Sequence, residues 1–418
     1  MPLTVIGFDE MSQRRELTLF LYRKGRDFQL PDSFNFRYVP LFTHNYASAG
    51  PPELLVREGV RLVDEPDEAD FLLFPYYLDP LLDRGGYHQA LRFVTKLAHY
   101  RRRPRRHVVF VDHDLDIRLN LPVVSFRASL DERRRDHGAH TIPLLVDDWA
   151  KFSHFDLDKV RFDVSFCGYA GSSEVRFGLL KSLIETRGNL RCLIRVFAKF
   201  HWHVPREDRL ESRQQYIDSL RDSLLVLCPG GTGHNSLRFF ETMSMGRIPV
   251  LVSDHCALPF EEAIDYDSFL LRIDEAQASQ AGRIINDWLA AQSRQQLLEK
   301  ARKARSVWEM YFSRAGCALQ IAEILARRAS DAGSLEQPVD DDVESRILPE
   351  LRAATQHALR VRNVYTAQQL YGFLGVAHGD AAMRDQFRAA RVQLKQGADE
   401  TSRGRAEALQ RLLVAHGL

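Results

Sequence analysis

A glycine-rich loop followed by a helix is the feature of this sequence best suited to chemistry. Residues 229–233 read Pro-Gly-Gly-Thr-Gly and join an apolar strand to a helix that opens near Ser236. Glycines let backbone amides approach an anion, and the positive end of a helix dipole favours phosphate. Arg238 can add a charge-assisted contact to a diphosphate, and Glu241 can accept hydrogen bonds from ribose hydroxyls. The loop has neither Walker nor GxGxxG spacing, so by itself a simple structural turn is an equal alternative.

Carboxylates follow two apolar runs in the first part of the chain, where they could act on a hydroxyl group. Asp112, His113 and Asp114 follow the run VVFV, and Asp79 follows the run FLLF. Open α/β sheets bind ligands at the carboxyl ends of their strands. A general base must reach the proton that it takes, and we expect Asp114 or Asp112 in that role. The alternative is that these carboxylates cap a helix or pair with the cluster Arg101–Arg106.

Short apolar runs alternate with helical patterns, which predicts two parallel α/β sheets. In the first block, strands are expected at 71–74, ending at Pro75, and at 108–111, with a helix over 87–100 between them. In the second block, strands are expected at 164–167, 190–197, 224–228 and 248–252, and helices at 177–184, 212–223 and 236–245. Gly246 stands where the end of a helix favours a left-handed residue.

The length of 418 residues predicts two or three domains. The apolar pattern breaks around 147–159, and after Ala329 the sequence becomes polar and acidic before a helical pattern resumes. We therefore expect an N-terminal domain over 1–155, a second α/β domain over 156–329, and a linker with an all-α tail over 330–418.

Composition and charge exclude several classes of protein. Lys+Arg number 57 against 56 Asp+Glu, which argues against a dedicated nucleic-acid binder. The 5 cysteines form no CxxC pair and indicate neither a disulfide framework nor a zinc site. The sequence shows no signal-peptide pattern and no apolar stretch near the ~18 residues of a membrane span, so a cytoplasmic location is expected. The clusters Arg101–Arg106 and Arg133–Arg135 could still bind an anionic acceptor or lipid head groups at the inner membrane face.

The run Tyr216–Tyr266 resembles the donor-binding block of the exostosin-type glycosyltransferases, family 47. Its motifs are LCPGGTG, SLRFFE and GRIPVLVSD. Upstream, DEADF and FPYY within residues 67–77 resemble the family's DPxxADxFxxPxY element, and a strand and loop FCG precede Arg176. The resemblance covers about residues 36–312.

The resemblance implies a GT-B fold of two facing Rossmann-like, doubly wound α/β domains, with the nucleotide sugar on the second. It implies an inverting glycosyltransferase that moves a sugar from a nucleotide-sugar donor, expected to be a UDP-sugar, to a glycan or glycoconjugate acceptor. It also implies no cofactor and no essential metal. The donor-binding residues that it implies are Gly168, Arg176, Gly230, Gly231, Gly233, Ser236, Arg238, Glu241 and Asp254.

The resemblance also implies roles for these residues. The loop Gly230–Gly233 and Ser236 would hold the diphosphate, and Arg238 would neutralise it as the leaving group departs. Glu241 would hold the ribose, and Asp254 would lie near the donor sugar. Two positions depart from the family pattern: a threonine replaces the usual alanine after the glutamate, and an arginine replaces the usual cysteine before IPV.

Several alternatives remain open from the sequence. The stretch Asp112–Asp114 spells DxD, a pattern that holds a divalent metal in another glycosyltransferase fold. A binding module that has lost transfer, or a scaffold acting through its helical tail, would keep the fold without the reaction. For the enzyme, the expected setting is bacterial polysaccharide biosynthesis. The expected partners are a nucleotide sugar, a glycan or lipid-linked glycan and a second copy docked through the tail, without nucleic acid.

Overall fold

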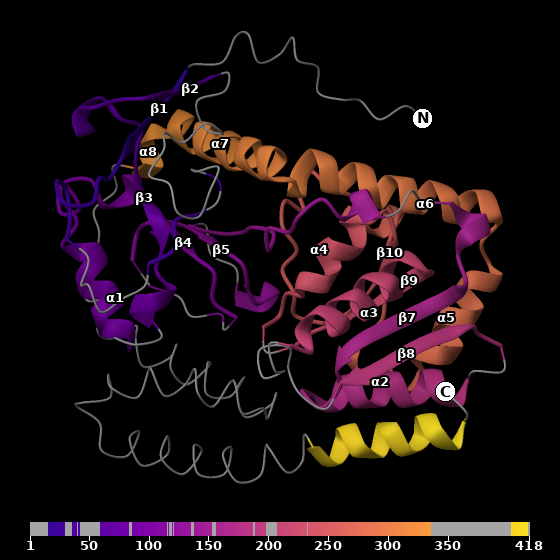
Figure 1. Ribbon diagram of the computed structural model, residues 1–418. Helices are drawn as coiled ribbons and strands as arrows, with labels where there is room; N and C mark the ends of the chain where they lie inside the picture. Colours follow the sequence, from indigo (N-terminus) through magenta and orange to yellow (C-terminus); the bar gives the residue numbers. More distant parts are fainter. Residues whose placement is uncertain are drawn as a thin grey trace.

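The protein folds into two α/β domains, each built on a parallel sheet (Figure 1). The computed structural model describes residues 16–29, 36–39, 41, 59–82, 86–114, 116, 119, 121–134, 138–152, 156–186, 189–197, 207–231, 233–335 and 403–416. Most of the predicted linker and helical tail, residues 336–402, lies outside the described residues. Two parallel-sheet domains with helices are the architecture of the GT-B fold, which confirms the predicted fold class.

The N-terminal sheet has six strands in the order β2-β1-β3-β4-β5-β6, all parallel. Their bounds are β1 (Leu17–Leu21), β2 (Val60–Leu62), β3 (Phe71–Tyr77), β4 (His107–Val111), β5 (Val124–Arg127) and β6 (Ala139–Thr141). The central strands β3 and β4 are buried along their whole length because both faces of the sheet are covered. Helix α1 (Gly86–Thr95) packs on one face through Ala90, Leu91 and Val94.

Strand β3 does not end at Pro75, so that sequence-based prediction is wrong. The strand runs on to Tyr77, and its pairing with β4 shifts in register between Leu73 and Tyr77. Proline has no N–H to donate to a neighbouring strand, so the sheet accommodates it at an irregular point of the pairing. The carbonyl of Pro75 accepts a hydrogen bond from the backbone N–H of Val39 at 3.0 Å.

The C-terminal sheet has five parallel strands in the order β11-β10-β9-β7-β8. Their bounds are β7 (Phe162–Tyr169), β8 (Cys192–Phe197), β9 (Ser223–Pro229), β10 (Ile248–Val252) and β11 (Leu271–Arg272). The helices of this domain are α2 (Glu174–Glu185), α3 (Arg209–Arg221), α4 (Leu237–Ser244), α5 (Ala281–Ala290) and α6 (Arg294–Val307). Every strand and helix predicted in this block is present, and Gly246 follows α4 with a φ of +67°, as predicted.

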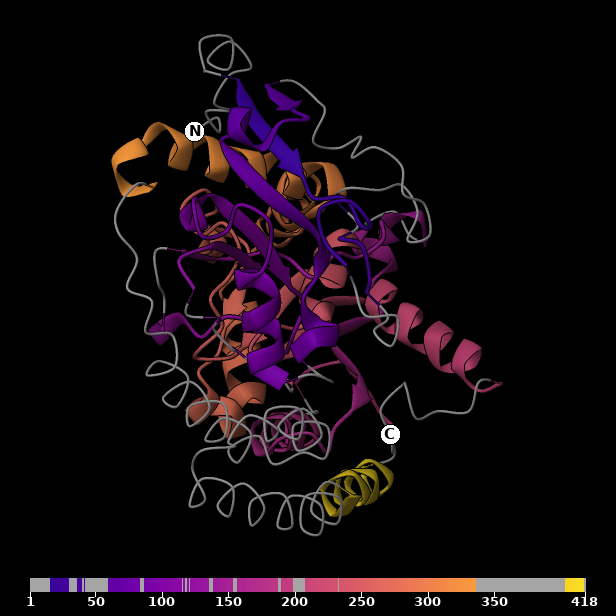
Figure 2. The ribbon, with the colours of Figure 1, turned by 90° about the vertical axis from the view of Figure 1, so that its left-hand side faces the viewer.

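Helix α7 (Arg314–Ser330) and the short α8 (Ala332–Leu335) return to the N-terminal domain. The apolar face of α7, with Ile321 and Leu325, packs in one core with Leu17, Leu19 and Phe71 of the N-terminal sheet. Figure 2 shows the orange α7 beside the indigo and purple strands of that sheet. Packing therefore assigns α7 to the first domain, although the sequence places nearly all of it within residues 156–329, the expected second domain. The division at 155 and 329 stays a prediction.

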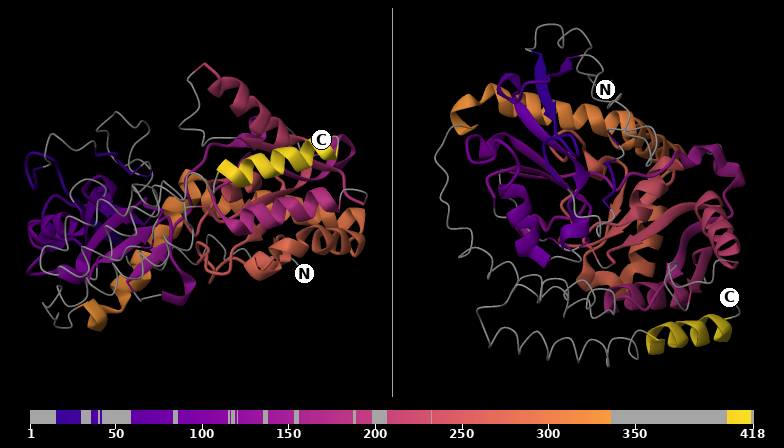
Figure 3. Two further views of the ribbon diagram at one scale, coloured as in Figure 1. Left: turned by 90° about the horizontal axis from the view of Figure 1, so that it is seen from below. Right: turned by 60° about the vertical axis from the view of Figure 1, so that its left-hand side comes forward.

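The end of the tail is a helix over residues 403–415, and it packs on the C-terminal domain of its own chain. Leu409 and Leu413 are buried in the core that α2 shares, and Arg405 pairs with Glu174 of α2 at 2.8 Å. Figure 3 shows this yellow helix lying beside α2. The predicted role of the tail in dimerisation has no support, since this apolar face is covered by the same chain.

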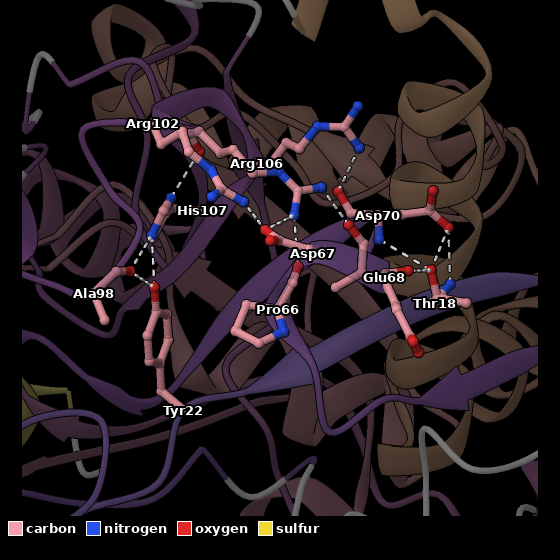
Figure 4. A network of polar contacts seen from close by, with 12 residues as sticks. Thr18, Tyr22, Pro66, Asp67, Glu68, Asp70, Ala98, Arg102, Arg106 and His107 are labelled. Carbon is pink, nitrogen blue, oxygen red and sulfur yellow. Dashed lines mark hydrogen bonds and ion pairs between the residues drawn. The ribbon is translucent and has the colours of Figure 1, made fainter.

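The predicted anion-binding cluster Arg101–Arg106 is largely used inside the N-terminal domain (Figure 4). Arg103 donates to the carbonyls of Pro66 and Ala69, each at 2.5 Å, and Arg102 forms an ion pair with Asp67. Arg106 also donates to this turn, to the carbonyl of residue 70 at 3.2 Å. The cluster thus fastens the turn that leads into β3, and contact with a membrane through it has no support.

Arg247, one of the two departures from the family pattern, is a buried structural residue. Only 1% of it is exposed, and burial lowers the pKa of its guanidinium to about 10. The guanidinium donates to the carbonyls of Leu220 and Arg221 at 3.2 and 2.6 Å, and to those of Met245 and Gly246 at 3.1 and 3.4 Å. These carbonyls end α3 and α4, where a cation is favoured by the helix dipole.

Replacing Arg247 with cysteine, the residue usual in the family, is expected to destabilise this protein. The change leaves buried carbonyls without donors, and each such group costs about 1–3 kcal/mol. We expect the free energy of unfolding to fall by about 3 kcal/mol or more, measured by urea denaturation. The exposed Arg283 on α5 offers the matched control, and Arg283→Ala should change stability by no more than about 0.5 kcal/mol. Equal stability of the two variants would contradict the structural role.

Candidate active site

The glycine-rich loop lies at the carboxyl end of β9 and leads into α4. Gly230 donates to the carbonyl of Val252 on β10 at 3.1 Å, so the loop starts tied to the neighbouring strand. Ser236 is the N-cap of α4 in extended conformation, and its side chain makes no capping hydrogen bond. The N–H of Phe239 donates to the carbonyl of Ser236 at 2.9 Å, but the Ser236 side chain caps no amide of this first turn, which suits the start of α4 to an anion. Thr232 lies outside the described residues.

Two guanidinium groups lie beside this loop, one on α2, which follows β7, and one on α4, which follows β9. Arg176, in the first turn of α2, donates to the carbonyls of Tyr169 and Gly230 at 2.7 and 3.1 Å and so joins two loops. Arg238, in the first turn of α4, donates to the carbonyl of Cys167 at 3.0 Å. Both guanidinium carbons lie over the ring of Phe166, at 5.7 Å for Arg176 and 4.6 Å for Arg238.

These two cations are poorly compensated. Burial, and after it the charge of Arg238, lowers the pKa of Arg176 to about 9. Among the described residues, the Nε atoms of both side chains are buried without a hydrogen-bond partner. A buried cation beside a second, partly buried one is unfavourable unless an anion offsets them, and of the two only Arg238 lies within the field of Glu241. The arrangement is suited to a ligand with at least one negative charge, and a diphosphate fits this requirement.

Gly168 permits the close approach of Arg238. Its φ of +154° is a conformation that glycine adopts most readily, and a Cβ there would lie 2.8 Å from Nη2 of Arg238. Any larger residue would therefore push the guanidinium away from the carbonyl of Cys167. This explains why a glycine stands at the end of β7.

Glu241 is buried on α4 and held by a tyrosine. The hydroxyl of Tyr216 donates to Oε2 of Glu241 at 2.5 Å, and Glu241 is 8% exposed. Burial raises the pKa of Glu241, while the hydrogen bond from Tyr216 and the charge of Arg238 oppose the rise. One carboxylate oxygen is thus committed to Tyr216, and the other is positioned by it.

Asp254 lies at the carboxyl end of β10, where the resemblance expects it, and is exposed. Its Oδ1 accepts a hydrogen bond from the backbone N–H of Glu275 at 2.7 Å. This bond fastens the start of the following 3-10 helix, which begins at Glu275. A role near the donor sugar remains a prediction.

The predicted carboxylates of the first domain gather at the ends of β3 and β4. Arg37 donates to Oδ2 of Asp112 at 3.0 Å, and the backbone N–H of Asp112 donates to Oδ2 of Asp79 at 3.2 Å. Burial, then the charge of Asp79, raises the pKa of Asp112 to about 7, and burial also raises the pKa of Asp79. A carboxylate with a pKa near 7 is suited to general base catalysis at neutral pH.

The donor-side loop and the carboxylate loop touch each other. A Cβ on Gly233 would lie 2.8 Å from the carbonyl oxygen of Asp114, so only glycine fits at this point of contact. Next to it, the N–H of His234 donates to Oγ of Ser129 at 3.1 Å, and Asn235 donates to the carbonyl of Ala128 at 3.0 Å. The predicted base region and the predicted donor loop are therefore neighbours in space.

A second connection between the domains uses a residue of the other arginine cluster. Asp131 and Cys256 form an antiparallel bridge, and Arg133 holds the Asp131 carboxylate with contacts of 3.0 and 2.6 Å. Burial favours a higher pKa for Asp131, but the hydrogen bonds from Arg133 and the nearby His234 hold it below its ordinary value. Arg133 thus acts as a structural residue, and Arg135 lies outside the described residues.

Solved glycosyltransferases have low structural similarity to the chain. A glycosyltransferase of Rickettsia africae has a TM-score of 0.38 at 9% identity, over 66% of this chain and 86% of that chain. A protein of Anabaena, solved in complex with UDP-glucose, has a TM-score of 0.37 at 13% identity, over 74% of this chain and 99% of that chain. The fold is therefore assigned from the strand order described above.

Curated relatives match a limited part of the chain. The exostosin-1 homolog of Caenorhabditis elegans is 34% identical over 116 residues, which are 26% of this chain and 29% of that protein. Exostosin-1 of Drosophila melanogaster is 31% identical over 106 residues, which are 25% and 13%. A probable arabinosyltransferase of Arabidopsis thaliana is 30% identical over 97 residues, which are 23% and 22%. The matched region spans less than a third of each relative.

The expectation of a bacterial-type protein in the cytoplasm, or at the inner membrane face, is wrong. The curated relatives are exostosins and glycosyltransferases of animals and plants, which conflicts with that setting. The cytoplasmic location is inferred from missing signal-peptide and membrane-span patterns. The absence of such patterns does not show where the folded domains act. Within the described part of the chain, every helix is too short or too polar to cross a bilayer.

A family model identifies the region that contains the glycine-rich loop. Residues 184–288 match the Exostosin GT47 domain, and they include β9, α4 and β10 with Arg238 and Glu241. This is the same block whose motifs suggest the family in the sequence. The region of residues 184–288 is therefore similar to the exostosin GT47 domain.

Proposed function

We propose that this protein binds a nucleotide sugar with its diphosphate beside Arg176 and Arg238, over the first turn of α4. The proposal is supported chiefly by the two guanidinium groups whose Nε atoms are buried and have no hydrogen-bond partner among the described residues. In the structural Arg247, by contrast, Nε, Nη1 and Nη2 all donate to carbonyls. The start of α4, where the Ser236 side chain makes no capping hydrogen bond, adds a second source of positive potential.

The rest of the donor would extend from this anchor. Glu241, positioned by Tyr216, would accept hydrogen bonds from the ribose, and the loop Gly230–Gly233 would line the diphosphate. The expected nucleobase of the donor is uracil, since the family resemblance implies a UDP-sugar. Relatives named arabinosyltransferase and glucuronosyltransferase make a pentose or a uronic acid reasonable first choices for the sugar.

The reaction would be a single displacement with inversion at the anomeric carbon. Asp112 or Asp114 would take the proton from an acceptor hydroxyl as its oxygen bonds to the anomeric carbon. The bond from that carbon to the phosphate oxygen would break, and the nucleoside diphosphate would leave with the electron pair. Arg238 and Arg176 would stabilise the charge that develops on the leaving group, a role that a divalent metal fills elsewhere.

The acceptor is proposed to be a glycan or glycoconjugate that enters from the first domain. The contact between Gly233 and Asp114 supports this, because it brings the donor loop beside the carboxylates of that domain. A binding module without transfer would need no base at this position. The placement of Asp112 and Asp114 therefore favours catalysis over binding alone.

A transfer assay tests the proposal. The protein is incubated with UDP-arabinose, UDP-glucuronic acid and further UDP-sugars, each with a panel of oligosaccharides, with and without EDTA. We expect acceptor-dependent release of UDP with one donor, insensitivity to EDTA, and a product whose anomeric configuration is opposite to that of the donor. Retention of configuration would exclude the single displacement, and loss of activity with EDTA would favour the metal-dependent DxD alternative.

A further inference from the structure

Arg37 is fixed in place by its main chain as well as by its side chain. Its carbonyl accepts a hydrogen bond from the N–H of Tyr77 at 3.1 Å, and Tyr38 forms an antiparallel bridge with Tyr76. The guanidinium carbon lies 5.4 Å from the centre of the Tyr77 ring. The segment is thus bound to the last residues of β3, and its side chain is directed across the ends of β3 and β4 to Asp112.

Asp112 and Asp79 form an interacting pair of acids, since the N–H of Asp112 donates to Oδ2 of Asp79 and the charge of Asp79 acts on the Asp112 carboxyl. Asp79 is 5% exposed, and its Oδ1 is buried without a hydrogen-bond partner among the described residues. The charged and titratable groups that act on the pair are Arg37, Tyr77, His113 and Asp114. The Asp112 side chain is 22% exposed, and the charge of Asp79 raises the pKa of Asp112, so the two carboxyl groups do not readily ionise together.

We propose that Arg37 is a positioning residue that orients the Asp112 carboxylate for catalysis and determines which carboxyl of the Asp112–Asp79 pair loses its proton first. The cation contacts Asp112 directly and reaches Asp79 only through space. The negative charge is therefore favoured on Asp112, and protonation is favoured on Asp79. This inference rests on the proposed function, in which Asp112 is the base. Asp79 in turn holds the backbone of Asp112 through the 3.2 Å hydrogen bond.

The proposal predicts a shift in the pH dependence of transfer when the cation is removed. The charge and hydrogen bond of Arg37 lower the pKa of Asp112, opposing burial and Asp79, which raise it to about 7. Arg37→Gln should therefore raise this pKa further, by about one unit or more for the loss of a close charge. At pH 6 the rate should fall about tenfold, because each unit corresponds to a tenfold change in the deprotonated fraction.

The activity test compares pH profiles of kcat for the wild type, Arg37→Gln and Arg37→Lys. We expect the Arg37→Gln profile to move to higher pH and to recover most of its rate above pH 9, while KM for the donor stays unchanged. Arg37→Lys keeps the charge and should lie between the two. An Arg37→Gln enzyme that is equally impaired at every pH, or not impaired at any pH, would overturn the proposal.

A stability measurement tests the same point without any acceptor. The raised pKa of folded Asp112 stabilises the protein at low pH, and this contribution is lost as pH rises through about 7. The difference in unfolding free energy between wild type and Asp112→Asn should therefore decrease up to about pH 7 and then level off. In the Arg37→Gln background the same difference should continue to decrease to higher pH. Identical curves in the two backgrounds would overturn the role of Arg37.

The two tests separate this inference from the proposed function. If no UDP-sugar binds or reacts, the proposed function fails, whereas the stability curves still report on Arg37 and Asp112. If transfer occurs and Asp112→Asn abolishes it while Arg37→Gln leaves the pH profile unchanged, the function stands and the role of Arg37 fails. Thermal unfolding of each variant establishes that it is folded before its profile is interpreted.

Discussion

Replacing Arg238 with alanine is expected to weaken binding of the nucleotide-sugar donor by roughly one to two orders of magnitude. A hydrogen bond to a charged group contributes about 1.5–3 kcal/mol, and each 1.4 kcal/mol is tenfold in affinity. Arg238 reaches the site from the first turn of α4, and its Nε has no partner among the described residues. Isothermal titration calorimetry with UDP and with the reacting UDP-sugar measures the loss.

Two further variants define the cause of that loss. Arg238→Lys keeps the charge but not the planar fork, so it should recover only part of the affinity. Arg283→Ala removes an exposed arginine of the same domain, whose partner Asp287 lies on its own helix, and should leave binding unchanged. Donor affinity that is equal in Arg238→Ala and Arg283→Ala would show that the diphosphate binds elsewhere.

Replacing Asp112 with asparagine is expected to reduce the rate of sugar transfer by about 10²–10⁴-fold, the usual contribution of a general base. The side chain keeps its size and can still accept a hydrogen bond from Arg37, so donor affinity should stay the same. In the wild type, the rate should rise with pH up to about 7 and then level off, because the base must be deprotonated. In Asp112→Asn this rise should be absent. Steady-state kinetics from pH 5 to pH 9 measures both effects.

The neighbouring Asp114 supplies the comparison for this variant. Asp114 is the other candidate for the general base, and its backbone lies against Gly233 of the donor loop. Asp114→Asn should retain transfer if Asp112 is the base. Full activity of Asp112→Asn, together with loss of activity in Asp114→Asn, would move the base to Asp114 and contradict the assignment.

The donor side of the molecule could be predicted from sequence because its features are local. The strand, the glycine-rich loop and the helix with Arg238 and Glu241 follow one another within residues 223–244. Strand and helix patterns in this domain are regular, and the end of α4 at Gly246 follows from the conformational freedom of glycine. The motifs also carry the family resemblance, which the match over residues 184–288 confirms.

Features that depend on distant parts of the chain could not be predicted. Arg37 belongs to no motif, and its contact with Asp112 joins residues 75 positions apart. The return of α7 to the first domain leaves no local mark, because an amphipathic helix does not specify which sheet covers it. Proline usually ends a strand, but β3 continues past Pro75 because its pairing with β4 shifts in register there. The arginine cluster at 101–106 reads as a surface patch until the carbonyls of residues 66–70 are placed beside it.

The central claim is that Arg176 and Arg238 form the diphosphate site of a nucleotide-sugar donor. It is tested most directly by the thermal unfolding midpoint of the protein with a panel of UDP-sugars and bare nucleotides, with and without EDTA. A ligand that binds only the folded state at 100 times its Kd stabilises it by about 2.7 kcal/mol. We predict a rise in the midpoint with UDP and at least one UDP-sugar, unaffected by EDTA and absent in Arg238→Ala. No rise with any nucleotide would mean that the glycine-rich loop is a structural turn and that the paired guanidinium groups bind no donor.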